Sequence, residues 1–416
     1  MRTIKKLEAA HIEAWVQILA NAFPGMQVNS EAEMIRFQER LQKSLSQRDV
    51  QSVGLFADDA LLGVMRLLDF TMTLHGRDVP VGGLGSVAVD LVHKKEKVAR
   101  DMVAHFLQYY QAQEAVLTAL YPFRPDFYRK MGFGYSTRMT HYAIAPASFP
   151  KGEKRQVSFL GEADKEAIAA CYERYRQQTH GMLSFPAAMW DRLFADGEFQ
   201  IVGYREGGAV RGYLLFKFEP VGNGNALSNN MLVRAFIYES TAVMQALMTF
   251  LHTQADQINR IILTVQDGNL HYLLADPRNG SGVMLPGINH ETAVSGLGIM
   301  FRVMDVPRLF AAWGDRDFGG QTCRLCITLR DSFLPENKGA TVVYFENGRC
   351  ALQSASSPYD VEITLDVADF SSLAIGAVTF KQLRQYGLVE LSDPAYTDVV
   401  NRIFWTENKP QTLTTF

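Results

Sequence analysis

The chain has 416 residues, of which 47% are hydrophobic and 20% are charged. This length predicts about three domains, and this composition excludes a chain that is mostly disordered. Lysine and arginine (41) nearly balance aspartate and glutamate (44), for a formal net charge of −3, so the composition indicates neither a nucleic-acid partner nor binding to an anionic membrane surface.

The N-terminal stretch, MRTIKKLEAAHIEAW, carries acids and a histidine where a signal peptide would have an unbroken apolar segment. No apolar run approaches the roughly 18 residues of a membrane-spanning helix. We therefore expect a cytoplasmic protein with no membrane partner.

The cysteines are too few for a disulfide framework. Cys323 and Cys326 form a CxxC, but they lie in QTCRLCITLR, which predicts a strand. No second CxxC or paired histidine follows at zinc-site spacing. We interpret all of them, Cys171 and Cys350 included, as structural residues and expect no metal.

In the N-terminal part, residues 53–90 predict strands, with turn signals at Asp58-Asp59 and His75-Gly76. A long amphipathic helix is expected next, because apolar residues recur at helical spacing. Those residues are Val98, Ala99, Met102, Val103, Phe106, Leu107 and Tyr110. A strand over 115–122 and a short helix over 125–130, ended by Gly132, complete this unit.

The polar stretch 151–156, after Pro150, indicates a domain boundary near 150. The next unit repeats the order of elements, which suggests an internal duplication. Its expected elements are a helix over 164–178, strands over 201–220 and 235–240, a helix over 241–257 and a strand over 261–265.

A third unit is expected after the Gly- and Asn-rich residues 278–299. It has predicted strands over 323–331, 340–353 and 361–367. A C-terminal helix opens at Asp393-Pro394 and turns four residues inward: Val399, Val400, Ile403 and Phe404. We expect domains over 1–150, 151–290 and 291–416.

The stretch VGGLGSVAVDLVHKKEKVARDMV, residues 81–103, predicts a strand, a lysine-bearing loop and the start of the long helix. Free backbone N–H groups at a helix N-terminus, with cations nearby, suit a pyrophosphate. Taken alone, the same residues also fit a solvated basic turn.

The stretch ALYPFRPDFYRKMGFGY, residues 119–135, places Tyr128 on the short helix. A tyrosine is protonated at neutral pH and can act as a general acid. Taken alone, Tyr128 also fits an aromatic packing residue.

Together these two stretches resemble the Gcn5-related N-acetyltransferase (GNAT) superfamily, and within it the Eis-like subgroup. The second unit, DSFLPENKG and the final helix with its short tail extend the resemblance over the whole chain. It implies a mixed α/β and α+β fold, with two tandem GNAT-type domains of mixed sheet flanked by helices, followed by a sterol-carrier-like α+β domain. It also implies acetyl-coenzyme A (acetyl-CoA) as acyl donor.

By the resemblance, the donor binds along one strand and the loop after it. The implied donor residues are Val87, Ala88, Val89, Lys94, Lys95, Lys97, Val98 and Ala99. This sequence has Lys97 where the family has a loop glycine, and Leu91 where it usually has a proline. A side chain at a glycine position can block close approach of the backbone to a phosphate, so we expect weakened donor binding.

The resemblance also implies two catalytic groups. Tyr128 matches the tyrosine that protonates the departing thiolate, and the carboxylate of Phe416 would help to deprotonate the amine. Without the resemblance, Phe416 would be interpreted as a disordered terminus. Phe23 and Phe37 are weaker candidates for the acceptor site.

The second unit has Glu239-Ser240-Thr241 where the first has its basic loop, so we expect no CoA site there. We expect an N-acetyltransferase that acts on a small-molecule amine (aminoglycoside, polyamine or lysine-like) and, by the resemblance, a homohexamer. The alternatives are a non-catalytic CoA- or lipid-binding protein with a decayed donor site and a carrier whose C-terminal domain holds an apolar ligand.

Overall fold

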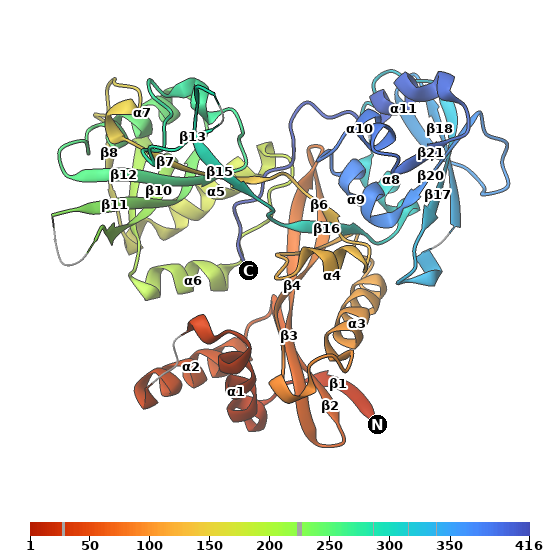
Figure 1. Ribbon diagram of the computed structural model, residues 1–416, viewed down its shortest axis with the longest axis horizontal. Helices are drawn as coiled ribbons and strands as arrows, with labels where there is room; N and C mark the ends of the chain where they lie inside the picture. The colour runs from red at the N-terminus through yellow and green to blue at the C-terminus, as the bar shows by residue number, and fades with distance from the viewer. Residues whose placement is uncertain (27–29, 223–226, 286, 315, 338) are drawn as a thin grey trace. The chain divides into compact units, whose positions relative to one another are not determined.

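The computed structural model describes residues 1–416 except 27–29, 223–226, 286, 315 and 338. It divides into two compact units (Figure 1). The first comprises Met1–Ser136, Ile299–Pro410 and Thr415–Phe416, and the second comprises Thr137–Gly298 and Gln411–Thr414. Among the described residues, no helix has both the length and the apolar character needed to cross a membrane.

The first unit contains a seven-stranded mixed sheet. Its strands, in spatial order, are β1 (Arg2–Lys6), β2 (Val50–Ala57), β3 (Ala60–Leu74), β4 (Arg77–Val89), β5 (Leu117–Leu120), β16 (Met300–Val303) and β6 (Gly134–Tyr135). Strands β1 to β4 are antiparallel, and β5 is parallel to β4. The β-rich residues 53–90 are confirmed.

Helices cover both faces of this sheet (Figure 1). They are α1 (Ile12–Ala22), α2 (Glu31–Ser44), α3 (Val98–Ala112) and α4 (Pro125–Arg129). On one face, Val64 and Ala88 pack with α1, and on the other face Met65 and Leu84 pack with α3. The predicted helix at 98–110 is confirmed, and its apolar stripe is buried as expected from its spacing, except for Ala99, which is half-buried.

A five-stranded sheet completes the first unit. Its spatial order is β19 (Arg349–Leu352), β18 (Gly339–Glu346), β17 (Cys323–Arg330), β20 (Val361–Asp366) and β21 (Val389–Leu391). The accompanying helices are α8 (Val306–Trp313), α9 (Val367–Ala374), α10 (Phe380–Gln385) and α11 (Thr397–Ile403). Of the C-terminal residues predicted to face inward, Val400, Ile403 and Phe404 are buried and Val399 is half-buried.

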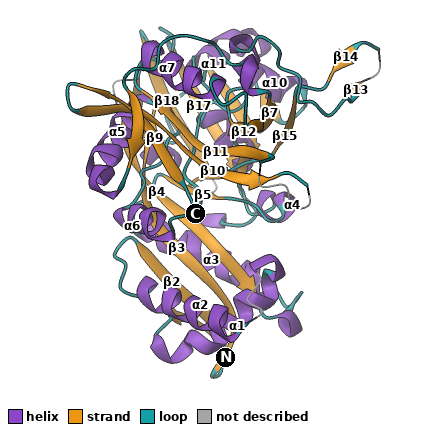
Figure 2. Ribbon diagram, turned by 90° about the vertical axis from the view of Figure 1, so that its left-hand side faces the viewer, coloured by secondary structure: helices purple, strands orange, loops and turns teal. Residues whose placement is uncertain are grey.

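The second unit has its own seven-stranded sheet. In spatial order the strands are β15 (Ala293–Gly296), β7 (Met139–Ile144), β12 (Ile258–Val265), β11 (Asn229–Tyr238), β10 (Ala209–Pro220), β9 (Gln200–Glu206) and β8 (Val157–Leu160). Its helices are α5 (Lys165–Gln178), α6 (Ala187–Asp196) and α7 (Thr241–His252). The short strands β13 (Met284–Leu285) and β14 (Asn289–His290) pair antiparallel as a separate two-stranded sheet (Figure 2).

The two seven-stranded sheets follow one plan. Each has four antiparallel strands, a fifth parallel to the fourth, and two further strands that pair antiparallel beyond it. The duplication indicated by the order of elements therefore extends to the order of strands. In the first sheet the sixth strand, β16, comes from residues far along the chain, and in the second sheet it is β7.

This exchange bears on where one domain ends and the next begins. Strand β7 lies before residue 150 but pairs in the second sheet, and β16 lies after residue 290 but pairs in the first. Chain order alone does not reveal which sheet receives a strand. The boundaries at 150 and 290 stay a prediction.

Candidate active site

Strand β4 extends beyond the end of its parallel neighbour, β5. The β4–β5 pairing extends from Val81 opposite Leu117 to Leu84 opposite Leu120, where β5 ends. The rest of β4, Gly85–Val89, therefore has β3 on one side and no strand of the described pairings on the other. Its backbone N–H and C=O groups on that side are available to a ligand.

A β-bulge lies in the same segment. The β3–β4 register shifts between Val64 and Arg66, and Ser86 has a left-handed backbone with φ +50°. Val87 and Val89 are half-buried, and Ala88 is 2% exposed. Bulges redirect the backbone next to binding sites.

The loop after β4 carries the cations predicted from the sequence. Lys94, Lys95 and Lys97 are all exposed, whereas Val98 is buried and Ala99 is half-buried at the start of α3. The Lys95 backbone has φ +67°, and Lys97, the N-cap of α3, has φ +66°. Lys97 thus adopts the left-handed conformation in which glycine is the residue without strain.

One acid within this loop has its own cationic neighbours. A guanidinium N–H of Arg2 donates to the Glu96 carbonyl oxygen (2.8 Å), and Arg2 also pairs with Asp101 of α3 (2.9 Å). The Glu96 carboxylate lies 3.4 Å from Arg2 and 3.3 Å from Nδ1 of His93. Glu96 stays 47% exposed beside these partners, and the three exposed lysines outnumber it, so the loop retains a net positive charge.

Tyr128 lies on α4 and is only 7% exposed. Its ring packs edge-on against Phe127 and Phe133. Burial raises the pKa of Tyr128 to about 12. The phenol therefore stays protonated across the physiological range, as a proton donor requires.

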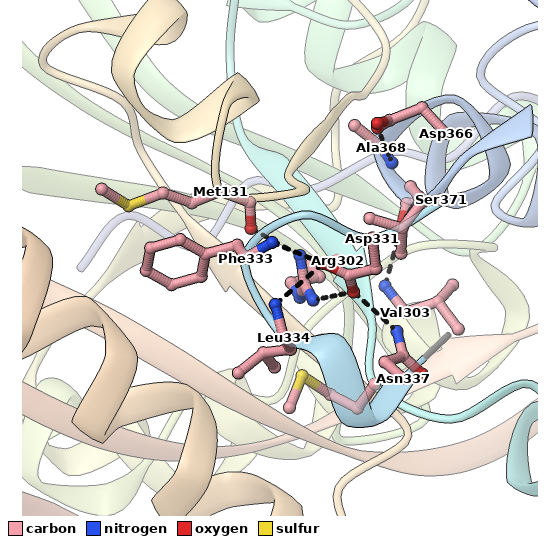
Figure 3. A network of polar contacts seen from close by, with 12 residues as sticks. Met131, Arg302, Val303, Asp331, Phe333, Leu334, Asn337, Asp366, Ala368 and Ser371 are labelled. Carbon is pink, nitrogen blue, oxygen red and sulfur yellow. Dashed lines mark hydrogen bonds and ion pairs between the residues drawn. The ribbon is translucent and has the colours of Figure 1, made fainter. Parts of the chain in front are cut away.

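The turn that follows Tyr128 requires glycine. A Cβ at Gly132 (φ +84°) would lie 1.6 Å from Nη1 of Arg302, and a Cβ at Gly134 would lie 2.1 Å from the Ala368 carbonyl oxygen. Arg302 pairs with Asp331, and both side chains are almost fully buried (Figure 3). The glycines of the MGFGY stretch thus permit close packing against residues far along the chain. No sequence motif identified Arg302 as a neighbour of this turn or Asp331 as the partner of Arg302.

Phe416 reaches the open segment of β4. Its ring centroid lies 4.8 Å from that of Phe70 and 5.5 Å from that of Tyr121. A Cβ at Gly83 would lie 3.1 Å from the Phe416 ring, and a Cβ at Gly85 would lie 3.7 Å from its carboxyl carbon. The carboxyl carbon of Phe416 therefore lies beside Gly85, the first β4 residue past the end of β5.

Comparisons with known proteins agree with this geometry. Family models described as acetyltransferase (GNAT) domains match residues 3–136 and 181–297, and a sterol carrier protein domain matches residues 306–412. N-acetyltransferase Eis of Mycobacterium tuberculosis is 26% identical over 337 residues, which are 76% of each chain. The chain belongs to the GNAT acetyltransferases, and its domain order resembles that of the Eis proteins. It is accordingly an acyltransferase that uses acetyl-CoA.

Solved structures show the same fold over the whole chain. A GCN5-related N-acetyltransferase from Anabaena variabilis has a TM-score of 0.83 at 19% identity, with 100% of both chains covered. Eis1 from Mycobacterium abscessus has a TM-score of 0.76 at 20% identity, again with 100% of both chains covered. The prediction of two GNAT domains and a sterol-carrier-like domain is confirmed.

The remaining candidates from the sequence lie elsewhere in this Eis-like fold. Phe23 and Phe37 are half-buried and pack against the apolar cluster of α1 and α2, which includes Trp15 and Leu19. The described contacts place them in that cluster, so a role in acceptor binding stays a prediction.

In the second GNAT domain the parallel strand pairing also ends before the fourth strand does, but the loop that follows this strand is different. Its parallel β11–β12 pairing ends at Val233 opposite Leu263. Between β11 and α7 there are only Glu239 and Ser240, and Glu239 pairs with Arg174 and Arg211. Neither Glu239 nor Ser240 is a lysine or arginine that could bind a phosphate. This difference favours a single donor site, in the first domain.

The described part of the chain contains no group of three or more histidine, cysteine or acidic residues arranged to hold a metal. Cys323 and Cys326 are buried in β17 as free thiols. They are three positions apart on a strand and therefore point to opposite faces, which suits packing and not chelation.

Proposed function

We propose that this chain transfers an acetyl group from acetyl-CoA to a primary amine of a small molecule by direct attack, without an acyl-enzyme. The observation that carries the proposal is the position of the Phe416 carboxyl group beside Gly85, where β4 leaves β5. One compact unit contributes all three groups: the free edge of β4, the buried phenol of Tyr128 and the carboxylate of Phe416.

The donor would bind along the free edge of β4. Backbone groups of Val87, Ala88 and Val89 would hold the pantetheine arm, and one N–H would face the thioester oxygen as its charge develops. The pyrophosphate would meet Lys94, Lys95 and Lys97 together with the N–H groups of Val98 and Ala99. Lys97 retains the left-handed backbone, which supports this fit although the glycine is missing.

The chemistry needs one proton removed and one supplied. The amine nitrogen attacks the thioester carbon and gives up a proton toward the Phe416 carboxylate, directly or through one water. The carbon–sulfur bond then breaks as the Tyr128 hydroxyl donates its proton to the departing thiolate. The raised pKa of Tyr128 supports this assignment, because the donor must be protonated when the bond breaks.

The acceptor class proposed here is an amine on an aminoglycoside, a polyamine or a lysine-like group. The test combines acetyl-CoA calorimetry with thiol release over a panel of these amines. Donor binding at micromolar concentration together with amine-dependent thiol release supports the proposal. Acetyl-CoA binding without thiol release on any amine would favour the alternative, a non-catalytic CoA-binding protein.

The assembly proposed is a homohexamer, by resemblance to the family. Light scattering of the purified chain measures its mass directly. A monomer at assay concentration would contradict this assembly and leave the chemistry untouched.

A further inference from the structure

Residues 331–337 fold around the carboxylate of Asp331. Oδ1 of Asp331 accepts hydrogen bonds from the backbone N–H groups of Phe333 (3.0 Å) and Leu334 (2.9 Å). Oδ2 accepts from the Asn337 side-chain amide (3.1 Å) and also from Nη2 of Arg302 (Figure 3). Asp331 is 1% exposed, so all of its acceptor capacity is used inside the protein.

Arg302 links Asp331 to the turn that follows Tyr128. Its Nη2 binds Asp331, while its Nη1 donates to the Met131 carbonyl oxygen (2.5 Å). Arg302 is 0% exposed and cannot meet a substrate. A buried ion pair contributes little net stability compared with apolar packing, but its directed hydrogen bonds specify geometry.

Met131 is in turn hydrogen-bonded to the backbone of Tyr128. The backbone N–H groups of Met131 (2.9 Å) and Phe133 (3.2 Å) both donate to the Tyr128 carbonyl oxygen. The residue after Tyr128, Arg129, pairs with Asp369 of α9 at 2.5 Å. Groups from residues 299–410 therefore fix the short helix that carries the phenol on two sides.

We propose that Arg302 and Asp331 are positioning residues for Tyr128. They hold the turn at 131–133, and through it the orientation of the phenol toward the leaving sulfur. A proton donor must be placed to within a fraction of an ångström, and a shift of about 1 Å costs about 100-fold in rate. This inference rests on the proposed role of Tyr128, and it gives the 331–337 motif a task in catalysis that differs from lipid carriage.

The test is a double-mutant cycle on kcat. Arg302→Lys retains the positive charge beside Asp331, but one ammonium cannot replace a planar fork that donates to Asp331 and to the Met131 carbonyl. We expect kcat to fall about tenfold with the KM for acetyl-CoA within about twofold, because Arg302 acts on proton transfer and not on donor binding. In the Tyr128→Phe background, Arg302→Lys is expected to change kcat less than twofold.

A matched control separates positioning from general destabilisation. Arg176 is also a buried arginine that binds a carboxylate, Glu173, but it lies in the second unit. Arg176→Lys should lower the thermal midpoint without lowering kcat per folded molecule. If Arg302→Lys does not fold, Asn337→Ala enters the same cycle, with an expected loss of about threefold in kcat that disappears in the Tyr128→Phe background.

Equal losses in both backgrounds would overturn the inference and leave the role of Tyr128 intact. Unchanged kcat in folded Arg302→Lys, or in Asn337→Ala, would overturn it too. If Tyr128→Phe itself retains the wild-type kcat, the proposed mechanism fails and the inference fails with it.

Discussion

The carboxyl carbon of Phe416 lies beside Gly85, 3.7 Å from the position that a Cβ atom would take there. The Phe416 ring is held separately, against Phe70 and Tyr121. The two parts of this residue can therefore be tested independently.

Displacing the Phe416 carboxylate should lower kcat more than removing the Phe416 ring does. Adding one glycine after Phe416 preserves the ring contacts but displaces the charge, and we expect kcat to fall about tenfold or more, the scale of acid–base assistance. Phe416→Ala retains the terminal carboxylate and should mainly raise KM. Thiol-release kinetics on both variants measure this difference, and an extended chain with wild-type kcat would make the carboxylate a bystander.

The pH profile should lack a basic limb. The folded pKa of Tyr128 is raised to about 12 by burial, so its protonated form persists to well above pH 10 and is lost only as the pH approaches 12. We therefore expect kcat to rise with pH as the amine loses its proton and then to stay level up to about pH 10. A decline of kcat centred near pH 8 or 9, measured on folded enzyme, would assign the proton donor to another group.

Lys97→Gly should separate backbone strain from charge. A lysine at φ +66° carries a conformational penalty that glycine lacks, so we expect the free energy of unfolding to rise by up to about 1 kcal/mol. The variant also loses a cation, so the KM for acetyl-CoA should rise several-fold and its dependence on salt should weaken. Urea unfolding and kinetics at two salt concentrations measure both effects. Lys151→Gly, an exposed lysine of the second unit, is the control for charge removal elsewhere on the surface.

How far the sequence predicted the fold can be seen in particular elements. Helix α3 follows its apolar period, and the breaks between β2, β3 and β4 lie at the predicted turn signals, Asp58-Asp59 and His75-Gly76. Helix α9 was not predicted, because all of its residues are buried and no amphipathic period remains. The sixth strand of the first sheet, β16, is joined to it only by long-range pairing that no local pattern encodes.

The residues of the site also fall into those that local motifs predicted and those that only long-range contacts bring together. The lysine loop and Tyr128 are contiguous with their motifs, and their burial and exposure follow from local structure. Arg302 and Asp331 lie far from Tyr128 in sequence, and an isolated arginine on a strand carries no signal of its partner. The spacing of Asp331 and Asn337 is compatible with a closed polar turn within residues 331–337, but it carries no signal of Arg302 or Tyr128.

Gly132→Ala should be much more destabilising than a left-handed glycine substitution elsewhere. The new Cβ would lie 1.6 Å from Nη1 of Arg302 and 2.7 Å from a Val367 methyl, both held in the buried interior. Gly207 has a comparable left-handed backbone (φ +57°) with no heavy atom within 4 Å of its Cβ position, so Gly207→Ala isolates the conformational penalty. We expect about 1 kcal/mol for Gly207→Ala and about 3 kcal/mol or more for Gly132→Ala, measured as the change in the free energy of unfolding in urea. Equal costs at the two positions would mean that the turn after Tyr128 can move away from Arg302, and the close packing at Gly132 would then be no constraint on the phenol.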